Sequence, residues 1–485
     1  MAALAGRDES TDQKPQHTYN PTGTNSIYPI FLIVNVAMGS GILNFPKAFD
    51  EAGGILVATT VHVILLMFIV MGFLVLAHTA DMCRPGPATT LHGTMEGMAG
   101  RCGRIVTSSL VALNCFGTCI SLLIVIGDQL DKTFSAVYGQ DFYHNWYMNR
   151  SFTIPACACS FILPLCYSRR IDFLRIPSTL GVISIFYLIG LIMYEYYAGN
   201  YKPGTIKTRP TQFMDMFLVV PNICFGYDGH IEVISIYSCM KHRTFKNITF
   251  VVLSAVTVCF VCYTLLGVYG YLTFGSLVNQ DVLLSYDGGG LVYAGMVVMA
   301  LKSATSYPVL LFCGREAIES FFTDLESVRA TNIAASKIWH KETSTYGTEI
   351  LNNNKTMGSG IYGMENSFLS ILMQGRGVNQ KELIVRFLCV TTWFSLSLGL
   401  AVAIPNIGQI IKMLGCFAIV FIFVFPGLCL VMCTLQSDPS RMMPKRSWVF
   451  VIIGIIFIIL GVIFFGVPFV RVVYKLINGG KKYPS

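Results

Sequence analysis

Long apolar stretches recur along this chain, each close to the length that a helix needs to cross a lipid bilayer. Such a helix needs about 20 mostly apolar residues. The composition agrees, because 54% of the residues are hydrophobic and only 12% are charged, whereas soluble domains carry roughly a quarter charged residues. The sequence therefore predicts an all-α, multi-pass membrane protein and excludes a single soluble core. The eleven predicted spans are 27–50, 54–80, 105–130, 152–168, 179–199, 213–237, 248–275, 290–314, 383–405, 407–435 and 448–470.

Lysine and arginine are concentrated in alternate loops, which predicts a cytosolic N-terminus. The polar residues 1–26 are expected to form a disordered cytosolic arm, and residues 471–485 a short tail. Residues 322–381 are polar and are expected to form a long cytosolic loop. This loop has either a regulatory or tethering role, or it is a tolerated insertion. Asn149 begins an Asn-Arg-Ser sequon in an outside loop, which predicts N-glycosylation there.

The first predicted span is interrupted near the middle of the membrane, where an unpaired backbone group costs the most free energy. Within "VNVAMGSGILNFPKAF", Gly39-Ser40-Gly41 lies at the middle of the membrane, and Pro46 follows. Glycine and proline weaken a helix, and in hydrocarbon each freed backbone group needs a new partner. A break at this depth therefore suggests that a solute uses the freed groups.

The sixth span has a similar interruption, since Pro221 is followed by "FGYDGH". Two broken helices five spans apart are typical of an inverted repeat of five plus five helices. The predicted first repeat covers residues 27–199 and the second covers 213–435, with the span at 448–470 appended.

The two breaks expose peptide groups of both polarities. Half-helix N-termini attract an anion, and half-helix C-termini offer carbonyl oxygens to a cation. A free amino acid carries both charges, so we expect its carboxylate to bind the N–H groups of Ser40, Gly41 and Ile42, with Gly39 and Gly41 allowing close approach. The ammonium is expected at carbonyls around Phe225, beside Tyr227 and Asp228.

Other function classes find little support. No basic run interleaved with aromatic residues suggests nucleic acid, and no phosphate-binding loop suggests ATP-driven pumping. No His/Cys/Asp constellation suggests an enzyme or a resident cofactor. Most of the 16 cysteines lie in apolar runs, where cysteine packs as a small hydrophobe.

Six blocks in order resemble the sodium-coupled neutral amino acid transporters of the amino acid/auxin permease family, nearest to the branch of the lysosomal glutamine and asparagine exporter. The blocks are "NVAMGSGILNFPKAF", "FGTCISLLIVIGDQLDK", "PNICFGYDGH", "YLTFGSLVNQDVLLSY", "TSYPVLLFCGR" and "FIFVFPGLCL". The resemblance implies eleven helices in the leucine-transporter (LeuT) type fold. It also implies Na⁺ as a co-transported ion, with Asn35 and Ser306, beside Thr305, as its ligands.

Two intramembrane charges depart from the family, which has small or polar residues at both positions. Lys302 lies near the middle of the eighth span, and Asp228 lies in the second break. Intramembrane charges are usually paired or functional. Three hypotheses follow: Lys302 and Asp228 form an ion pair; the Lys302 ammonium replaces sodium; or Asp228 meets a cationic or amide substrate side chain or carries a coupled proton.

His230 matches a family histidine beside the second break and is expected either to sense pH or to be a structural imidazole. The favoured function is secondary active transport of small neutral amino acids, resembling glutamine and asparagine, coupled to sodium or protons. The alternative is an amino-acid sensor that signals through its cytosolic loop. The resemblance leaves the lysosomal membrane and the plasma membrane open as locations, and the oligomeric state is unknown.

Overall fold

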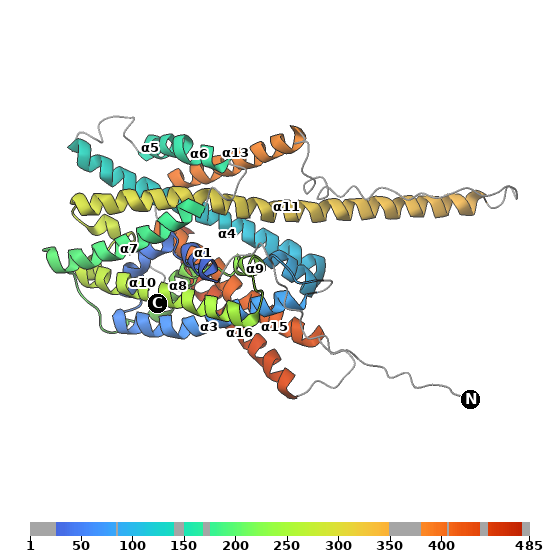
Figure 1. The fold of residues 1–485 in the computed structure, drawn as a ribbon, viewed down its shortest axis with the longest axis horizontal. Helices are drawn as coiled ribbons and strands as arrows, with labels where there is room; N and C mark the ends of the chain where they lie inside the picture. Colours follow the sequence, from blue (N-terminus) through green and yellow to red (C-terminus); the bar gives the residue numbers. More distant parts are fainter. Residues whose placement is uncertain are drawn as a thin grey trace.

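The computed structural model describes residues 26–83, 86–139, 150–167, 175–348, 380–404, 407–436 and 445–477. Within these ranges the elements are all helices, packed side by side in one bundle (Figure 1). In chain order they are α1 Ile27–Ala37, η1 Ser40–Asn44, α2 Phe45–Glu51, α3 Ile55–Met82, α4 Leu91–Tyr138, α5 Arg150–Cys157, η4 Ala158–Ile162, α6 Leu163–Cys166, α7 Arg175–Ala198, η6 Phe213–Val219, α8 Val220–Gly226, α9 Val233–Ser238, α10 Phe245–Phe274, η7 Gly275–Leu277, η8 Val282–Ser285, α11 Gly290–Thr348, α13 Gln380–Ala403, α14 Ile407–Ile419, η9 Val420–Val424, α15 Phe425–Gln436 and α16 Lys445–Ile477.

Eight helices in the described ranges are long and apolar enough to cross a membrane, and the bent pair of Ile27–Ala37 with Ser40–Glu51 makes a ninth span if it is counted as one. Two other predicted spans correspond to shorter apolar helices, Phe152–Cys166 and Phe213–Gly226. The structure thus supports an all-helical membrane protein, while the count of eleven spans and the repeat remain predictions.

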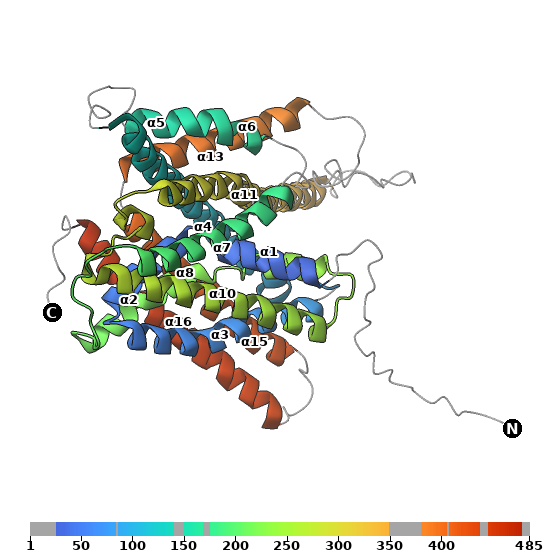
Figure 2. The ribbon, with the colours of Figure 1, turned by 60° about the vertical axis from the view of Figure 1, so that its left-hand side comes forward.

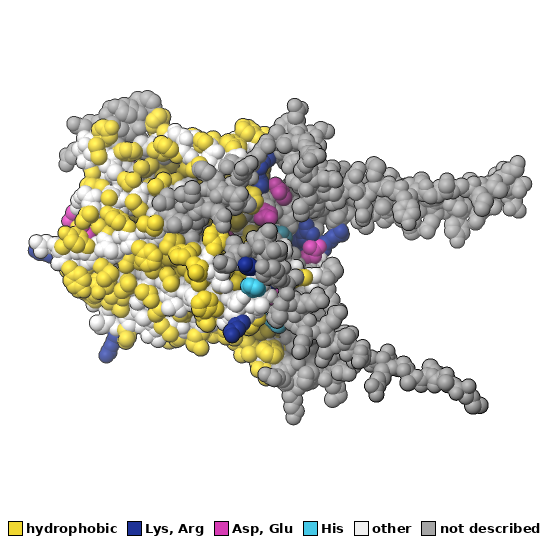
Figure 3. Space-filling model, in the orientation of Figure 1, with side chains coloured by type: hydrophobic (Ala, Val, Ile, Leu, Met, Phe, Trp, Pro, Cys, Tyr) yellow, Lys and Arg dark blue, Asp and Glu magenta, His cyan; other side chains and the backbone are white. Residues whose placement is uncertain are grey.

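The surface of the bundle suits a lipid environment. Hydrophobic side chains cover most of its body, and the charged side chains lie mainly towards its two ends (Figure 3). Large side chains such as Leu56, Phe250 and Ile459 are more than half exposed, which would be costly in water at about 25 cal/mol per Å². In hydrocarbon the same exposure carries no such penalty.

Local sequence explains the irregular places in these helices. α4 contains a kink at Gly100, whose φ of 64° is a conformation that few other residues adopt. Its membrane part therefore begins after the kink, close to the start predicted at residue 105. The short segment from Phe152 to Cys166 contains Pro155 and Pro164, and π-helical turns interrupt it at Ala158–Ile162. Proline removes a backbone donor, so it favours such departures from the α-helix.

α11 continues well beyond the membrane. Its apolar part ends near Phe321, but the helical backbone runs to Thr348 and projects from the bundle (Figure 1). The sequence predicted a loop from residue 322, so the structure places the end of the helix later. Polar composition argues against burial in lipid, but it does not oppose helix formation, because Ala, Glu, Lys and Arg are all good helix formers.

Several expected features lie outside the described residues. They include Asn149 with its predicted glycosylation, most of the N-terminal arm, residues 349–379 of the predicted loop, and the end of the C-terminal tail.

The breaks of the two interrupted spans lie inside the bundle, whereas the start of each span reaches its surface, where Ile27 and Phe213 are more than half exposed. α11 packs along α4 and α7, α8 packs on α14, and α10 packs against α1, α2 and α3 (Figures 1 and 2). We refer to the side of the bundle on which α1 begins as the α1 side and to the opposite side as the α2 side.

The contact between α14 and α8 depends on a glycine. A Cβ atom at Gly415 would lie 2.0 Å from the carbonyl oxygen of Pro221, which is too close for any real contact. We expect Gly415→Ala to reduce stability by about 1–3 kcal/mol, as overpacking does. The matched control is Gly399→Ala in α13, where a Cβ meets no atom within 4 Å; it should be neutral or slightly stabilising. Thermal unfolding of the detergent-solubilised variants measures the difference, and equal midpoints would contradict this account.

Candidate functional site

The first break separates α1 from η1. α1 ends at Ala37, Met38 leaves the helical region with ψ 64°, and Gly39 is extended with φ −80° and ψ −153°. The chain then resumes as a 3₁₀-helix at Ser40 and continues as α2, bent by 52° relative to α1. The predicted interruption of the first span is therefore confirmed.

The second break separates α8 from α9. α8 ends at Gly226, and α9 begins at Val233. Between them the backbone forms turns, with the Gly229 N–H donating to the carbonyl of Tyr227 at 2.8 Å. The sixth span is therefore also interrupted at the predicted place.

Donors from neighbouring helices satisfy the carbonyls that the breaks set free. The hydroxyl of Tyr263 in α10 lies 2.9 Å from the carbonyl oxygen of Ala37 and 2.6 Å from that of Gly226. The ammonium of Lys302 in α11 donates to the carbonyl oxygen of Met38. Tyr263 thus connects the two breaks directly, and because a phenol has one hydrogen, it donates to one of the two carbonyls at a time.

The half-helices on the α2 side are also joined. The Asn44 side chain of η1 donates from Nδ2 to the Asn222 Oδ1 of α8 at 2.9 Å. Gly41 faces Phe225 so closely that a Cβ atom would lie 2.8 Å from the ring. Both breaks are therefore closed against each other on the α2 side.

Ion pairs reinforce this closure nearer the surface. Lys412 of α14 contacts Glu51 of α2 at 2.6 Å, and Asp50 contacts Lys47 at 3.1 Å and Lys207 at 3.0 Å.

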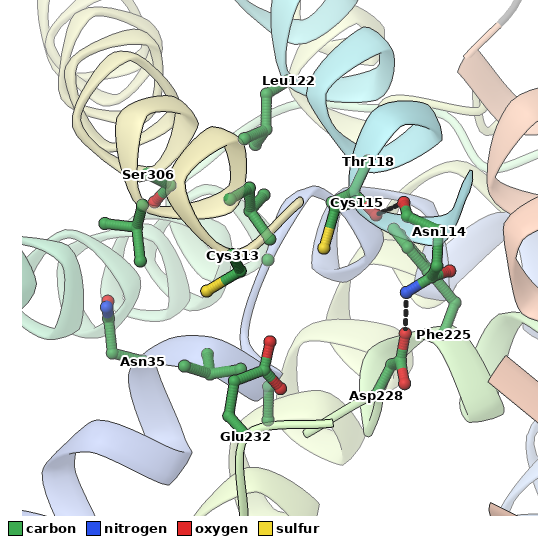
Figure 4. A pocket seen from close by; sticks show the side chains of 15 residues that line it. Asn35, Asn114, Cys115, Thr118, Leu122, Phe225, Asp228, Glu232, Ser306 and Cys313 are labelled. Carbon is green, nitrogen blue, oxygen red and sulfur yellow. Dashed lines mark hydrogen bonds between the residues drawn. The ribbon is translucent and has the colours of Figure 1, made fainter. Parts of the chain in front are cut away.

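A cavity lies directly at the two breaks (Figure 4). Its walls come from the end of α1, from α4, from the second break and from α11. It includes Glu232 at the α9 end of the second break, and Asn114 of α4 and Cys313 of α11, which lie further towards the α1 side. The cavity therefore extends from the breaks towards the side on which α1 begins.

The polar atoms facing this cavity are mostly hydrogen-bond acceptors. Asp228 accepts a hydrogen bond from the Asn114 side chain at 2.6 Å through one oxygen (Figure 4), and its other oxygen is buried without a partner. The side-chain oxygens of Asn35 and Asn114 and one oxygen of Glu232 are buried without partners as well. A buried polar atom without a partner costs about 1–3 kcal/mol, so this set favours a ligand that brings several donors.

The structure gathers some of the predicted site residues around the cavity. Asn35, Gly39, Phe225, Asp228 and Ser306 line it.

The other predicted residues lie close by with different roles. Ser40 bonds the Ser121 hydroxyl of α4 at 2.8 Å, and Gly41 and Ile42 are buried in η1. The Thr305 hydroxyl donates to the carbonyl of Lys302 at 2.9 Å, within its own helix. Tyr227 bonds His62 of α3 at 2.9 Å through its hydroxyl.

His230 is fully buried behind the second break. Its ring stacks on Phe73, with 3.8 Å between centroids, and Nε2 lies 3.2 Å from the carbonyl oxygen of Ile69. These contacts favour the structural imidazole over the pH sensor, and the role of His230 stays a prediction.

The expected ion pair between Lys302 and Asp228 is not among those that the described residues form. Asp228 binds Asn114 of α4, whereas Lys302 binds the backbone of Met38. The physical reason is that the freed carbonyl of the first break is an acceptor within reach of the ammonium, while a side-chain amide already occupies one oxygen of Asp228.

Sequence reasoning missed Asn114, Glu232 and Tyr263 as site residues. A signal existed for Glu232, because a carboxylate within an apolar span is usually paired or functional. Asn114 is a single amide within the apolar stretch "SLVALNCFGTC", and only packing decides which way it points.

Comparisons with known proteins define the class. The family described as transmembrane amino acid transporter protein matches residues 23–469. The chain therefore belongs to this family, which confirms the expectation of a transporter and not an enzyme.

Individual relatives are similar over nearly the whole chain. Sodium-coupled neutral amino acid transporter 7 of Danio rerio is 32% identical, over 95% of this chain and 90% of the relative. The Homo sapiens protein of the same name is 31% identical, over 93% and 88%. Solute carrier family 38 member 8 of Homo sapiens is 29% identical, over 96% and 97%.

Among solved structures, the crystal structure of MhsT in complex with L-phenylalanine is similar with a TM-score of 0.48 and 13% identity, over 93% of this chain and 100% of that one. A likeness at this level does not by itself establish a shared fold.

The Tyr263 hydroxyl offers a direct test of the site. We expect Tyr263→Phe to lower the rate of amino acid uptake about tenfold, because a buried carbonyl at one break loses its donor at a cost of about 1–3 kcal/mol. Uptake into proteoliposomes measures this. The control is Tyr187→Phe, whose hydroxyl donates to the Leu291 carbonyl away from the cavity; it should stay within twofold of the unmodified protein. Unchanged uptake in Tyr263→Phe would show that the hydroxyl does not support the breaks.

Proposed function

We propose that this protein is a secondary active transporter of small neutral amino acids resembling glutamine and asparagine, coupled to sodium or protons. One observation carries the proposal: the cavity lies where two interrupted helices offer peptide groups at the level of their breaks. A zwitterionic amino acid needs hydrogen-bond donors for its carboxylate and acceptors for its ammonium a few ångströms apart, and the cavity at the two breaks has both nearby.

The donors for the substrate carboxylate are the first N–H groups of η1. The first three residues of a 3₁₀-helix, here Ser40, Gly41 and Ile42, have no acceptor for their N–H groups within that helix. They also lie at its positive end, where an anion is stabilised. Gly39, which lines the cavity, leads directly into this turn.

Carbonyl and side-chain oxygens at the cavity are suited to accept hydrogen bonds from the ammonium and the side chain of the substrate. The carbonyls of Ala37 and Gly226 share the Tyr263 hydroxyl, so at any moment one of them has a lone pair available to an ammonium, although the Ala37 carbonyl also accepts the Gly39 N–H at 2.8 Å. Residues Asn114, Asp228 and Glu232 line the cavity, and each has a side-chain oxygen without a partner. A side-chain amide would donate two hydrogen bonds to them, which favours glutamine or asparagine over a purely aliphatic amino acid.

The names of the relatives motivate the rest of the proposal. They are called sodium-coupled neutral amino acid transporters, and Asn35 and Ser306 offer neutral oxygens at the cavity for a coupling ion. A lysosomal membrane or a plasma membrane is the proposed location, on the resemblance described above.

Uptake of radiolabelled glutamine by proteoliposomes tests the proposal. We expect time-dependent accumulation that unlabelled glutamine and asparagine compete with most strongly among the twenty amino acids. Binding of glutamine without flux would instead favour the sensor, and competition restricted to large aliphatic amino acids would contradict the proposed specificity.

A variant of Asp228 tests the role of the side-chain oxygens. We expect Asp228→Asn to raise the KM for glutamine about tenfold, because a hydrogen bond to a neutral acceptor is weaker than one to a carboxylate. The KM for alanine, which has no side-chain donor, should change less than threefold.

Glu195→Gln serves as the control for that variant, since Glu195 bonds the Tyr201 hydroxyl near the end of α7, outside the cavity. Both KM values should stay unchanged in this variant. An equal loss for glutamine and alanine in Asp228→Asn would mean that Asp228 does not contact the substrate side chain.

A further inference from the structure

Lys302 is the one buried cation among the described side chains. It lies in α11 with 4% of its surface exposed, and the other arginines and lysines whose side chains are described are more accessible. A charge at this depth is expensive unless it is paired or functional, so its surroundings require an explanation.

The partner of Lys302 is backbone and not a carboxylate. Its ammonium donates to the carbonyl of Met38, immediately after α1 ends. None of the ion pairs within the described ranges includes Lys302. The ammonium is therefore placed at the negative end of a half-helix, where freed carbonyls attract a cation.

A coupled sodium ion is expected at the same kind of place. In transporters with broken helices, unwound carbonyls and half-helix C-terminal ends coordinate Na⁺. Asn35 of α1, the side-chain ligand that the family resemblance implies for sodium, lies one turn before Met38.

A third helix confirms that Asn35 and Lys302 share one small space. A Cβ atom at Gly181 of α7 would lie 2.5 Å from the Asn35 Oδ1 and 3.7 Å from the Lys302 Cε. The Asn35 oxygen is buried without a partner. The oxygens that suit sodium thus lie close to an ammonium that the chain itself supplies.

We propose that the Lys302 ammonium takes the place of the coupling sodium ion, so that this protein moves amino acids without requiring sodium. The inference rests on the proposed transport function and specifies its coupling. A second cation about 4 Å from the ammonium would be repelled strongly enough to lower its affinity roughly a thousandfold at the effective dielectric constant of proteins. Because the lysine is covalently attached, it returns with the protein and no sodium ion is carried.

Glutamine uptake by the full-length protein in proteoliposomes, with sodium or with choline on both sides, tests this inference. We expect the unmodified protein to take up glutamine equally, within twofold, in both buffers. A strict sodium requirement would overturn the proposal about Lys302 and leave the transport function intact. Absence of uptake in both buffers would instead overturn the transport function.

The variant Lys302→Thr replaces the ammonium with a neutral oxygen. We expect its uptake to fall at least tenfold in choline and to be restored by millimolar sodium, because Na⁺ then fills the vacated position. Lys302→Arg, which keeps the charge, should retain uptake without sodium. The control Lys246→Thr changes an exposed lysine at the start of α10 and should behave like the unmodified protein.

The remaining outcomes are equally decisive. If Lys302→Thr folds and transports without sodium, or folds and is not rescued by it, Lys302 is a structural residue and the proposal is wrong. If the variant does not fold, ²²Na⁺ flux in the unmodified protein decides, since sodium entry in proportion to glutamine would overturn the proposal and its absence would support it.

Discussion

A peptide group in hydrocarbon must find a partner inside the protein, and the structure is organised around two places where it does so outside a helix. Three carbonyls at the breaks face donors from other helices: the Tyr263 hydroxyl donates to Ala37 or to Gly226, one at a time, and the Lys302 ammonium donates to Met38. An unpartnered group there would cost several kcal/mol. The surrounding helices are therefore as necessary to the breaks as the glycines that permit them.

The same constraint explains why the cavity is polar on one side. The half-helices meet closely on the α2 side, where Gly41 contacts Phe225 and Lys412 pairs with Glu51. Towards the α1 side they leave room, and the oxygens of Asp228 and Glu232 remain without full partners. These unpartnered oxygens destabilise the protein interior, and the same oxygens can accept hydrogen bonds from a small polar ligand.

The breaks themselves could be predicted from sequence, because in each of these two spans several glycines lie together near the middle of an apolar run and a proline is close by. A single proline is a weaker signal, since Pro308 lies inside the continuous α11. The depth of Lys302 and Asp228 could also be read from their positions along their spans. Their partners could not, since depth does not determine the direction in which a side chain points around a helix. Asn114 was missed for the same reason. The length of α11 was underestimated because a polar composition excludes lipid contact without excluding a helix.

The hydrogen bond between the side-chain amides of Asn44 and Asn222 has a mechanical consequence. It links two half-helices that belong to different spans and lie on the same side of the breaks. Two half-helices joined by this hydrogen bond would move together. An opening of the bundle on that side would therefore expose the peptide groups of both breaks at the same time. Without the hydrogen bond each half-helix could move independently. A bound solute could then remain bound to the peptide groups of one break after those of the other had moved away.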